Sequence, residues 1–218
     1  MPFNLPNLLT LARIAAIPLV LASMAAGAAG SLDLDWARWI AALLFIAASV
    51  TDYFDGWLAR RWQLVSRLGR FLDPIADKLL VASVLLLMCA FGWLKSWHII
   101  AAVIILCREI MVSGLREFLA ELRVGLPVSS AAKWKTAIQM TALGVLLVGD
   151  TGPAWVMPVG LILLWFAAAL TLWTGYDYLR AGLAHMIEDP TAMPPPRPIG
   201  APPAPRRDED RRAGRSVT

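Results

Sequence analysis

The amino-acid sequence contains six long stretches in which apolar residues predominate. They cover residues 8–29, 36–58, 72–93, 97–119, 132–149 and 154–180. Each is close to the length of about 20 residues that a helix needs to cross the hydrocarbon core of a bilayer. Apolar residues make up 58% of the 218-residue chain and charged residues 17%, whereas soluble domains average about 45–50% and about 25%. These features predict an all-α integral membrane protein, a bundle of six transmembrane helices.

The basic residues between these stretches predict how the bundle is oriented. In or beside the first, third and fifth connections the only basic residues are Arg38 and Lys95, whereas eight lie in or beside the second and fourth: Arg60, Arg61, Arg67, Arg70, Arg116, Arg123, Lys133 and Lys135. Short loops rich in lysine and arginine remain in the cytoplasm. We therefore expect these two connections and both termini on the cytoplasmic side of the inner (plasma) membrane. The formal charge of +4 arises from such flanking residues, so it does not indicate a nucleic-acid partner.

The two ends of the chain differ in character. No basic region precedes the apolar residues 14–30, so we interpret the first stretch as a retained helix and not as a cleavable signal. From residue 188 onward the sequence is rich in proline and charge, which predicts a disordered cytoplasmic tail. The expected organisation is a membrane domain over residues 1–187 and a tail over 188–218. Cys89 and Cys107 lie inside apolar stretches, where we expect them to pack as small apolar residues.

Four aspartates form the main chemical feature of the sequence. Asp52 and Asp55 are three residues apart, and Asp73 and Asp77 are four apart, so each pair shares one face of a helix. Both pairs are expected at the cytoplasmic ends of consecutive helices, where four uncompensated carboxylates would be costly. Divalent ions that prefer oxygen ligands, such as Mg²⁺, Mn²⁺ or Ca²⁺, would neutralise them. The alternatives are ion pairs with the neighbouring arginines and a divalent-cation transport pathway, although the latter would need acidic residues along the membrane depth.

The residues around these aspartates resemble a family motif. The order Asp-x-x-Asp-Gly-x-x-Ala-Arg, eight residues, then Gly-x-x-x-Asp-x-x-x-Asp is similar to that of the CDP-alcohol phosphotransferases. It is filled here by Asp52, Asp55, Gly56, Ala59, Arg60, Gly69, Asp73 and Asp77. The resemblance implies two divalent ions, Mg²⁺ or Mn²⁺, held by the four aspartates, and a cytoplasmic-side active site. It also implies CDP bound over Gly56 and Ala59, a phosphate contact from Arg60, a hydroxyl contact from Ser66, Asp77 as catalytic base, and a homodimer.

A wider resemblance over residues 4–180 indicates one branch of this family. Residues 4–13, 50–61, 71–78, 108–110 and 114–117 resemble the bacterial phosphatidylglycerophosphate synthases. This implies transfer of the phosphatidyl group of CDP-diacylglycerol to the 1-hydroxyl of sn-glycerol 3-phosphate by in-line displacement, giving phosphatidylglycerol phosphate and CMP. The same chemistry with serine, an inositol phosphate or phosphatidylglycerol as acceptor stays open.

A phosphorylated acceptor requires cations, and four are candidates: Arg108, Arg116, Lys133 and Lys135. An arginine as deep in an apolar stretch as Arg108 is a functional candidate, although it could instead pair with a carboxylate elsewhere in the bundle. Its neighbour Glu109 projects about 100° away around the helix and is expected to be a poor partner. Arg116 and the lysines could equally be anchors at the membrane surface.

The first helix supplies further candidates. Asn7 and Thr10 could contact the nucleotide, with Arg13 on the same face as Thr10, or could cap the start of the helix. His98 is expected in an external loop and His185 after the last helix, neither with a catalytic role.

Overall fold

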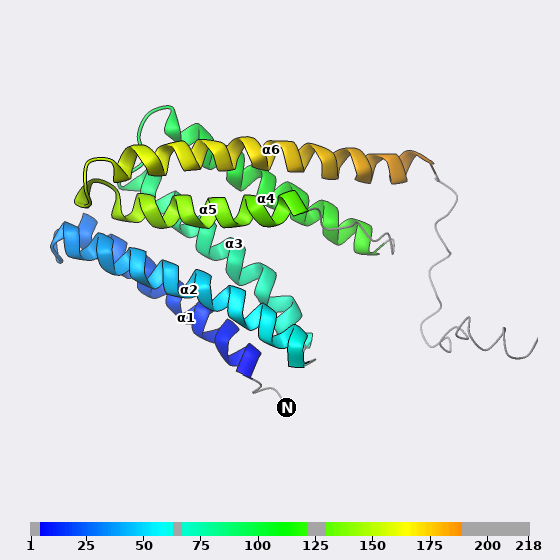
Figure 1. Cartoon of the computed structure of the whole chain (residues 1–218), viewed down its shortest axis with the longest axis horizontal. Coiled ribbons are helices and arrows are strands. Elements are labelled where there is room, and N and C mark those ends of the chain that lie inside the picture. The colour runs from blue at the N-terminus through cyan, green and yellow to red at the C-terminus, as the bar shows by residue number, and fades with distance from the viewer. Residues whose placement is uncertain (1–4, 63–66, 122–129, 189–218) are drawn as a thin grey trace, which may run out of the picture. The chain divides into compact units, whose positions relative to one another are not determined.

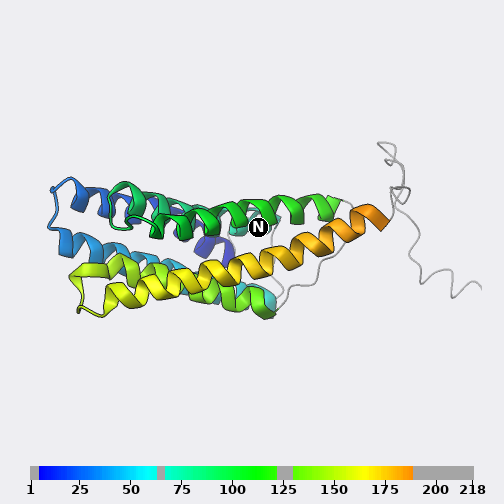
Figure 2. The same ribbon diagram turned by 90° about the horizontal axis from the view of Figure 1, so that it is seen from above.

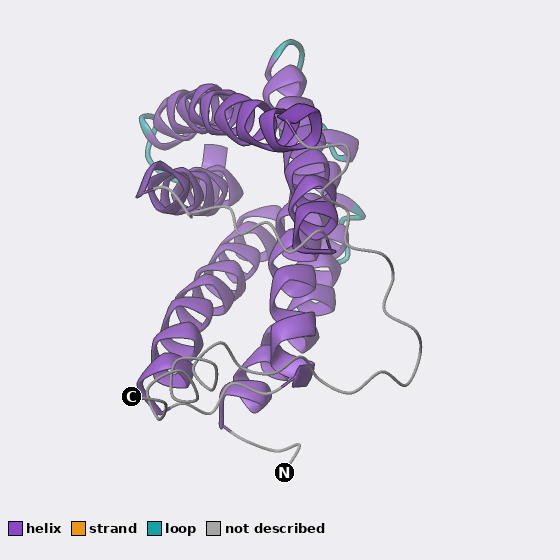
Figure 3. Ribbon diagram, turned by 90° about the vertical axis from the view of Figure 1, so that its right-hand side faces the viewer, coloured by secondary structure: helices purple, strands orange, loops and turns teal. Residues whose placement is uncertain are grey.

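The computed structural model describes residues 5–62, 67–121 and 130–188, with side chains over 9–51, 72, 74–119, 134–180 and 182–183. Within these ranges the chain is helical and contains no strand (Figures 1 and 3). The helices are α1 (Leu5–Ala28), α2 (Leu34–Trp62), α3 (Arg67–Ala90), α4 (His98–Glu121), α5 (Ser130–Val148) and α6 (Val156–Glu188), with a short 3₁₀ helix, η1 (Gly149–Thr151), after α5. Each α-helix coincides with one of the six predicted apolar stretches.

Four of these helices are long and apolar enough to cross a membrane. The stretches are Leu9–Ala28, Leu34–Thr51, His98–Leu119 and Val156–Arg180, in α1, α2, α4 and α6. The described part of α3 carries Asp77 and Lys78, and α5 carries Lys135 in its second turn. The structure therefore confirms an all-helical chain with four candidate spanning helices, and the assignment of α3 and α5 as spans stays a prediction.

Local signals in the sequence explain where the helices begin and end. After α1, Gly30 adopts a left-handed conformation with φ of 72°, and the Ser31 backbone N–H donates to the Ala26 carbonyl at 3.0 Å. This is the glycine-terminated helix end that lacks a Cβ penalty. The Asp33 carboxylate then accepts hydrogen bonds from the backbone N–H groups of Asp35 and Trp36 at 3.1 and 3.2 Å, which caps the start of α2.

The chain divides into two units, Met1–Leu183 and Ala184–Thr218, and the first contains the helical core. The helices of this unit lie lengthwise beside one another (Figure 2). Their inward faces form one apolar cluster to which all six helices contribute; it includes Met24, Phe45, Leu85, Ile105, Leu143 and Leu164. Large apolar residues also cover outward faces, for example Leu43, Ile110 and Ile162 at 63%, 73% and 68% exposure. A surface of this kind suits lipid contact.

Three structural details correct expectations from the sequence. His98 does not lie in a loop but begins α4, where its Nδ1 accepts a hydrogen bond from Trp165 Nε1 of α6 at 3.1 Å. His185 lies within α6, because that helix continues beyond residue 180 to Glu188. Arg38 is not a loop cation: it is 3% exposed within α2. Its Nε and Nη2 donate to the carbonyls of Leu147 and Leu146 at 3.0 and 3.1 Å, which satisfies the carboxyl end of α5.

Successive connections between the helices lie alternately at the two ends of the bundle. The α1–α2, α3–α4 and α5–α6 connections lie at one end, on the left in Figure 1, and the amino-terminal end of α1 lies at the other. At the first end, α2, α4 and α6 begin next to three exposed tryptophans, Trp36, Trp97 and Trp155. Tryptophans are enriched at the interface between membrane and water, so this end has the composition of an interfacial belt.

Candidate active site

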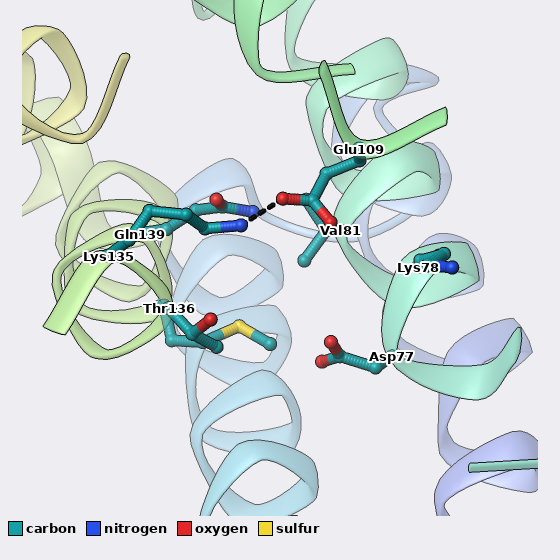
Figure 4. Close-up of a pocket in the computed structure, with 8 residues that line it drawn as sticks. Asp77, Lys78, Val81, Glu109, Lys135, Thr136 and Gln139 are labelled. Carbon is teal, nitrogen blue, oxygen red and sulfur yellow. Dashed lines mark hydrogen bonds and ion pairs between the residues drawn. The ribbon is translucent and has the colours of Figure 1, made fainter. Parts of the chain in front are cut away.

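A pocket opens between α3, α4 and α5. It is small and is lined by Asp77, Lys78, Val81, Glu109, Lys135, Thr136, Gln139 and Met140. Figure 4 shows the carboxyl groups of Asp77 on α3 and Glu109 on α4 facing the α5 residues Lys135, Thr136 and Gln139. The pocket therefore brings the two carboxylates and the Lys135 amine together between three helices.

Helical periodicity explains which residues of α3 and α5 reach this pocket. Asp77 and Val81 are four residues apart on α3, and Lys135 and Gln139 are four apart on α5. Residues at this spacing lie one above the other on the same helix face. Asp77, predicted as the catalytic base, and Lys135, predicted as an acceptor contact, thus line the same pocket.

The pocket lies at one level of the bundle. Asp77 and Lys135 each lie 13 residues from the end of their helix at Ala90 and Val148, which is about 20 Å at 1.5 Å per residue. Glu109 lies 11 residues after the start of α4 at His98, or about 17 Å by the same rise. The three ionisable groups therefore lie at about the same level, about 17–20 Å along their helices from the end that carries the α3–α4 and α5–α6 connections.

Glu109 is the main polar contact that sequence reasoning missed. Its Oε1 accepts a hydrogen bond from Arg108 Nη1 at 3.3 Å and also from Lys135 Nζ. The expectation that Glu109 would be a poor partner for Arg108 is therefore wrong. A difference of 100° describes the Cα–Cβ directions, but both long side chains bend toward a common point between the helices. A carboxylate beside an arginine within a spanning stretch was the signal that could have identified it.

Arg108 is directed toward α6 and does not line the pocket. Its Nε donates to the Thr171 carbonyl at 3.2 Å and its Nη2 to Thr174 Oγ1 at 3.0 Å. The residue is 7% exposed, and its guanidinium carbon lies 6.0 Å from the centre of the Tyr178 ring. Arg108 thus pairs with the carboxylate of its own neighbour Glu109 and, among the described residues, not with one elsewhere in the bundle as the alternative expected.

The other acceptor candidates are placed differently. Arg116 is exposed, and its guanidinium carbon lies 5.6 Å from the Tyr178 ring centre, so it is not one of the residues that line the pocket. Lys133 is within α5, but its side chain lies outside the described part of the structure. Of the four predicted acceptor contacts, the structure places Lys135 in the pocket.

Gln139 completes the polar lining on α5. It is 3% exposed, and its Oε1 has no hydrogen-bond partner among the described residues. A buried amide oxygen without a partner is costly for folding. Sequence reasoning did not identify Gln139, although its spacing of four from Lys135 places both on one helical face.

The remaining aspartates lie on helices at matching depths. Asp52 and Asp55 fall within α2, and Asp73 within α3, while their side chains are outside the described set. Asp55 and Asp73 are seven and six residues from the helix ends at Trp62 and Arg67, or about 10 Å at the helical rise. Asp52 and Asp77 are each ten residues from these ends, or about 15 Å. Measured from the α2–α3 connection, Asp55 and Asp73 therefore lie at one level, and Asp52 and Asp77 at a second, deeper level.

These positions bear on whether the residues suit a divalent ion. Among the described residues no group of three metal-ligating side chains occurs, and Asp77 is the only one of the four aspartates whose side chain is described. The donor set consists entirely of carboxylates, which hard divalent ions prefer, and Asp77 contributes its carboxylate to the pocket wall. The four aspartates therefore suit Mg²⁺ or Mn²⁺ both because their ligand atoms are carboxylate oxygens and because they lie at matching levels on α2 and α3.

The predicted nucleotide contacts lie on three elements. Gly56, Ala59 and Arg60 fall within α2, and Gly69 within α3; Ser66 lies outside the described residues. In α1, Thr10 and Arg13 are each 2% exposed. Because α1 begins at Leu5, Thr10 lies in its second turn and does not cap it. Asn7 is in the first turn, with its side chain outside the described set.

The sequence is similar to that of a known family and of several named proteins. The sequence model of a family described as CDP-alcohol phosphatidyltransferase matches residues 3–173. A protein of Rickettsia bellii named CDP-diacylglycerol–glycerol-3-phosphate 3-phosphatidyltransferase is 48% identical over 182 residues, covering 82% of this chain and 94% of that protein. Proteins with the same name from Shigella flexneri and Cereibacter sphaeroides are 43% and 36% identical, covering 86% and 87% of this chain and 100% of each of those proteins.

The family match covers well over half of the chain and includes the four aspartates, the pocket and most of α6. The alignments with relatives of 36–48% identity cover nearly the whole length of those relatives. The chain belongs to the CDP-alcohol phosphatidyltransferase family.

Proposed function

We propose that the protein transfers the phosphatidyl group of CDP-diacylglycerol to the 1-hydroxyl of sn-glycerol 3-phosphate, releasing CMP and phosphatidylglycerol phosphate. The observation that carries this proposal is the pocket that joins Asp77, of the family motif, to the buried cation Lys135. The family membership supports the phosphatidyl transfer, and the names of the relatives support this acceptor.

The acceptor proposal rests on the charge of the pocket. Lys135 is 4% exposed, and a buried ammonium group is retained only with charged or polar partners. Lys135 already has one such partner in Glu109; the phosphate of glycerol 3-phosphate would be a second, while serine and free glycerol lack a phosphate. We assign Lys135 the direct phosphate contact, with Lys133 and Arg116 as contacts nearer the cytoplasm and Arg108 acting behind Lys135.

The proposed chemistry is a single in-line displacement. The 1-hydroxyl oxygen forms a bond to the β-phosphorus of CDP-diacylglycerol, the bond from that phosphorus to the bridging oxygen of CMP breaks, and Asp77 takes the hydroxyl proton. Two divalent ions, Mg²⁺ or Mn²⁺, held by Asp52, Asp55, Asp73 and Asp77, would neutralise the diphosphate when bound. The rest of the catalysis comes from positioning the two substrates in a pocket with little water.

Nucleotide binding is assigned to the helices around the motif. Gly56, Ala59 and Gly69 leave space for the nucleotide to approach the helix backbone, and Arg60 contacts a phosphate. Polar contacts come from Asn7 and Thr10 on α1, from Asp52 and Asp55 on α2, and from Ser66 between α2 and α3.

We further propose that all six helices cross the inner (plasma) membrane, with both termini and the active site on the cytoplasmic side. The arginines and lysines in the helix turns that flank the α2–α3 and α4–α5 connections support this orientation, as do the exposed tryptophans at the opposite end. Membrane lipids surround the apolar outer faces, and by family resemblance the protein forms a homodimer. The tail, predicted over 188–218, is proposed as a disordered cytoplasmic segment over residues 189–218, which lie outside the described structure; residue 188 instead ends α6.

The test is an assay of the purified protein with CDP-diacylglycerol, Mg²⁺ or Mn²⁺, and a panel of acceptors. We expect CMP release with glycerol 3-phosphate, and none with glycerol, serine, inositol phosphate or phosphatidylglycerol. Turnover of serine equal to that of glycerol 3-phosphate would reject the acceptor assignment and keep the family chemistry. Metal uptake by proteoliposomes without CMP release would instead indicate a cation transporter.

A further inference from the structure

We propose that Glu109 is a positioning residue that holds the Lys135 ammonium group in the acceptor pocket and is itself held in place by Arg108 of α4, which is hydrogen-bonded to α6. This inference rests on the proposed function, because it assigns Lys135 to the acceptor phosphate. It assigns Glu109 and Arg108 a role in positioning Lys135, without contact between either residue and the reacting atoms.

The first step is the contact between Glu109 and Lys135. Lys135 Nζ donates to Glu109 Oε1, the side chain of Lys135 is 5% exposed and that of Glu109 is 18% exposed. A lysine side chain has four rotatable bonds and no fixed direction of its own. Because Glu109 is on α4 and Lys135 on α5, the carboxylate fixes the ammonium at the boundary between these helices, where both residues line the pocket.

The second step is the support of Glu109. The same Oε1 accepts from Arg108 Nη1 at 3.3 Å, while Arg108 Nε and Nη2 bond to Thr171 and Thr174 of α6. All three guanidinium nitrogens therefore have partners in the protein. The planar guanidinium donates in fixed directions, so α6 determines where Glu109 lies. Arg108 is suited to this supporting role and not to direct capture of a substrate.

The backbone of α6 makes room for this arrangement. A Cβ added at Gly175 would lie 3.0 Å from Arg108 Cγ and 3.5 Å from its Nε. A glycine at this position lets the arginine lie flat against α6 and reach Thr171 and Thr174. The contact sequence then runs from α6 through Arg108 and Glu109 to Lys135 and the pocket of Asp77.

The charges agree with a substrate that is a dianion. Arg108, Glu109 and Lys135 together carry one net positive formal charge next to the pocket. A lysine paired with one carboxylate oxygen keeps two further N–H donors, which can be offered to a phosphate. Glu109 thus orients the ammonium group without occupying all its donors.

The experiment is steady-state kinetics of the full-length protein in mixed micelles, with each substrate varied in turn. For Glu109→Gln we expect the KM for glycerol 3-phosphate to rise about tenfold or more, the order expected for a misplaced binding group. The KM for CDP-diacylglycerol should stay within about twofold, because Glu109 lies outside the nucleotide site in this scheme. Glu109→Asp, which keeps the carboxylate on a shorter side chain, should give a smaller rise. Glu117→Gln, an exposed carboxylate on the same helix, is the control and should change neither KM.

A double-mutant cycle separates positioning from a general structural role. If Glu109 acts through Lys135, then Glu109→Gln combined with Lys135→Gln should resemble Lys135→Gln alone, since the two effects are not additive. The proposal would be overturned if the effects of the two substitutions on KM multiplied in the double variant. It would also be overturned if Glu109→Gln left the KM for glycerol 3-phosphate unchanged or raised both KM values equally. If Glu109→Gln does not fold, Thr174→Val tests the same arrangement by removing a bond to Arg108, and it should raise the same KM by a smaller factor.

The wild-type protein distinguishes a failure of this inference from a failure of the proposed function. No CMP release with glycerol 3-phosphate by the wild type would reject the function itself. If the wild type turns over normally and the Glu109 variants have the same KM for glycerol 3-phosphate as the wild type, only the role of Glu109 is rejected.

Discussion

At the scale of single residues, Asp77 has two candidate roles that substitution can separate. It lines the pocket with Lys135, as a base near the acceptor should, and it belongs to the set of four aspartates expected to hold metal. A proton acceptor must lie within reach of the attacking hydroxyl, whereas a metal ligand must face the other aspartates. Asparagine keeps the size and one ligating oxygen of this side chain but removes its basicity.

We predict that Asp77→Asn slows the chemical step by about 10²–10⁴-fold, the usual contribution of general-base catalysis, and weakens nucleotide and metal binding only modestly. Single-turnover rates and CDP-diacylglycerol binding, compared with the wild type, measure the two effects. Binding that collapses in parallel with the rate would make Asp77 chiefly a metal ligand. No change in either quantity would reject its role in the mechanism.

The other three aspartates should behave alike. Asp52→Asn, Asp55→Asn and Asp73→Asn are each expected to abolish Mg²⁺- or Mn²⁺-dependent CMP release while the protein remains folded in the membrane, because each removes one negative ligand. The measurement is CMP release across a metal titration, and Asp150→Asn in η1 serves as the control. Two variants with turnover near that of the wild type would contradict a two-ion centre.

At the scale of elements, α1 and α2 come close together at a position where both side chains are small. A Cβ added at Gly27 of α1 would lie 2.5 Å from Ala37 Cβ of α2, and neither helix could adjust through a flexible side chain. In contrast, a Cβ at Gly114 of α4 would meet no atom within 4 Å. These two glycines therefore differ in packing although both lie in helices.

This difference predicts opposite effects of one substitution. Gly27→Ala should lower the free energy of unfolding by about 1–3 kcal/mol, the cost of overpacking a filled contact. Gly114→Ala should leave it unchanged or raise it by up to about 1 kcal/mol, because alanine is the better helix former. Unfolding of both variants in the same mixed micelles gives the comparison. Equal effects on stability would mean that α1 and α2 can separate at Gly27 without cost.

At the scale of the whole molecule, the distribution of charge and tryptophan predicts one orientation in the membrane. Starting from a variant without Cys89 and Cys107, single cysteines at Ser31, Lys95 and Asp150 should react with an impermeant thiol reagent in intact cells. Cysteines at Gln63 and Val128 should react only after the membrane is opened, since the basic connections are retained in the cytoplasm. The reverse labelling pattern would invert the proposed topology, and labelling of both groups from one side would exclude six spans.

Which stretches of the chain form helices, and the membership of the family, could be predicted from the sequence alone. A backbone in lipid must satisfy its own hydrogen bonds, so each apolar stretch of sufficient length forms a helix whatever its neighbours are. Helix ends follow from local signals as well, as Asp33 and Gly30 show. The spacing of Asp52, Asp55, Asp73 and Asp77 is also local, because it depends only on the period of the helix.

The partners of the buried charges were decided only by the tertiary structure. Arg38 was expected to be a loop cation, but it satisfies carbonyls of α5 more than 100 residues away. Glu109 was expected to project away from Arg108, but both meet Lys135 of another helix. Periodicity specifies the direction in which a side chain leaves its helix, whereas its partner depends on which helix faces it and how far a long side chain bends. Those quantities arise from packing, and for that reason the pocket and the role of Glu109 emerge only from the folded chain.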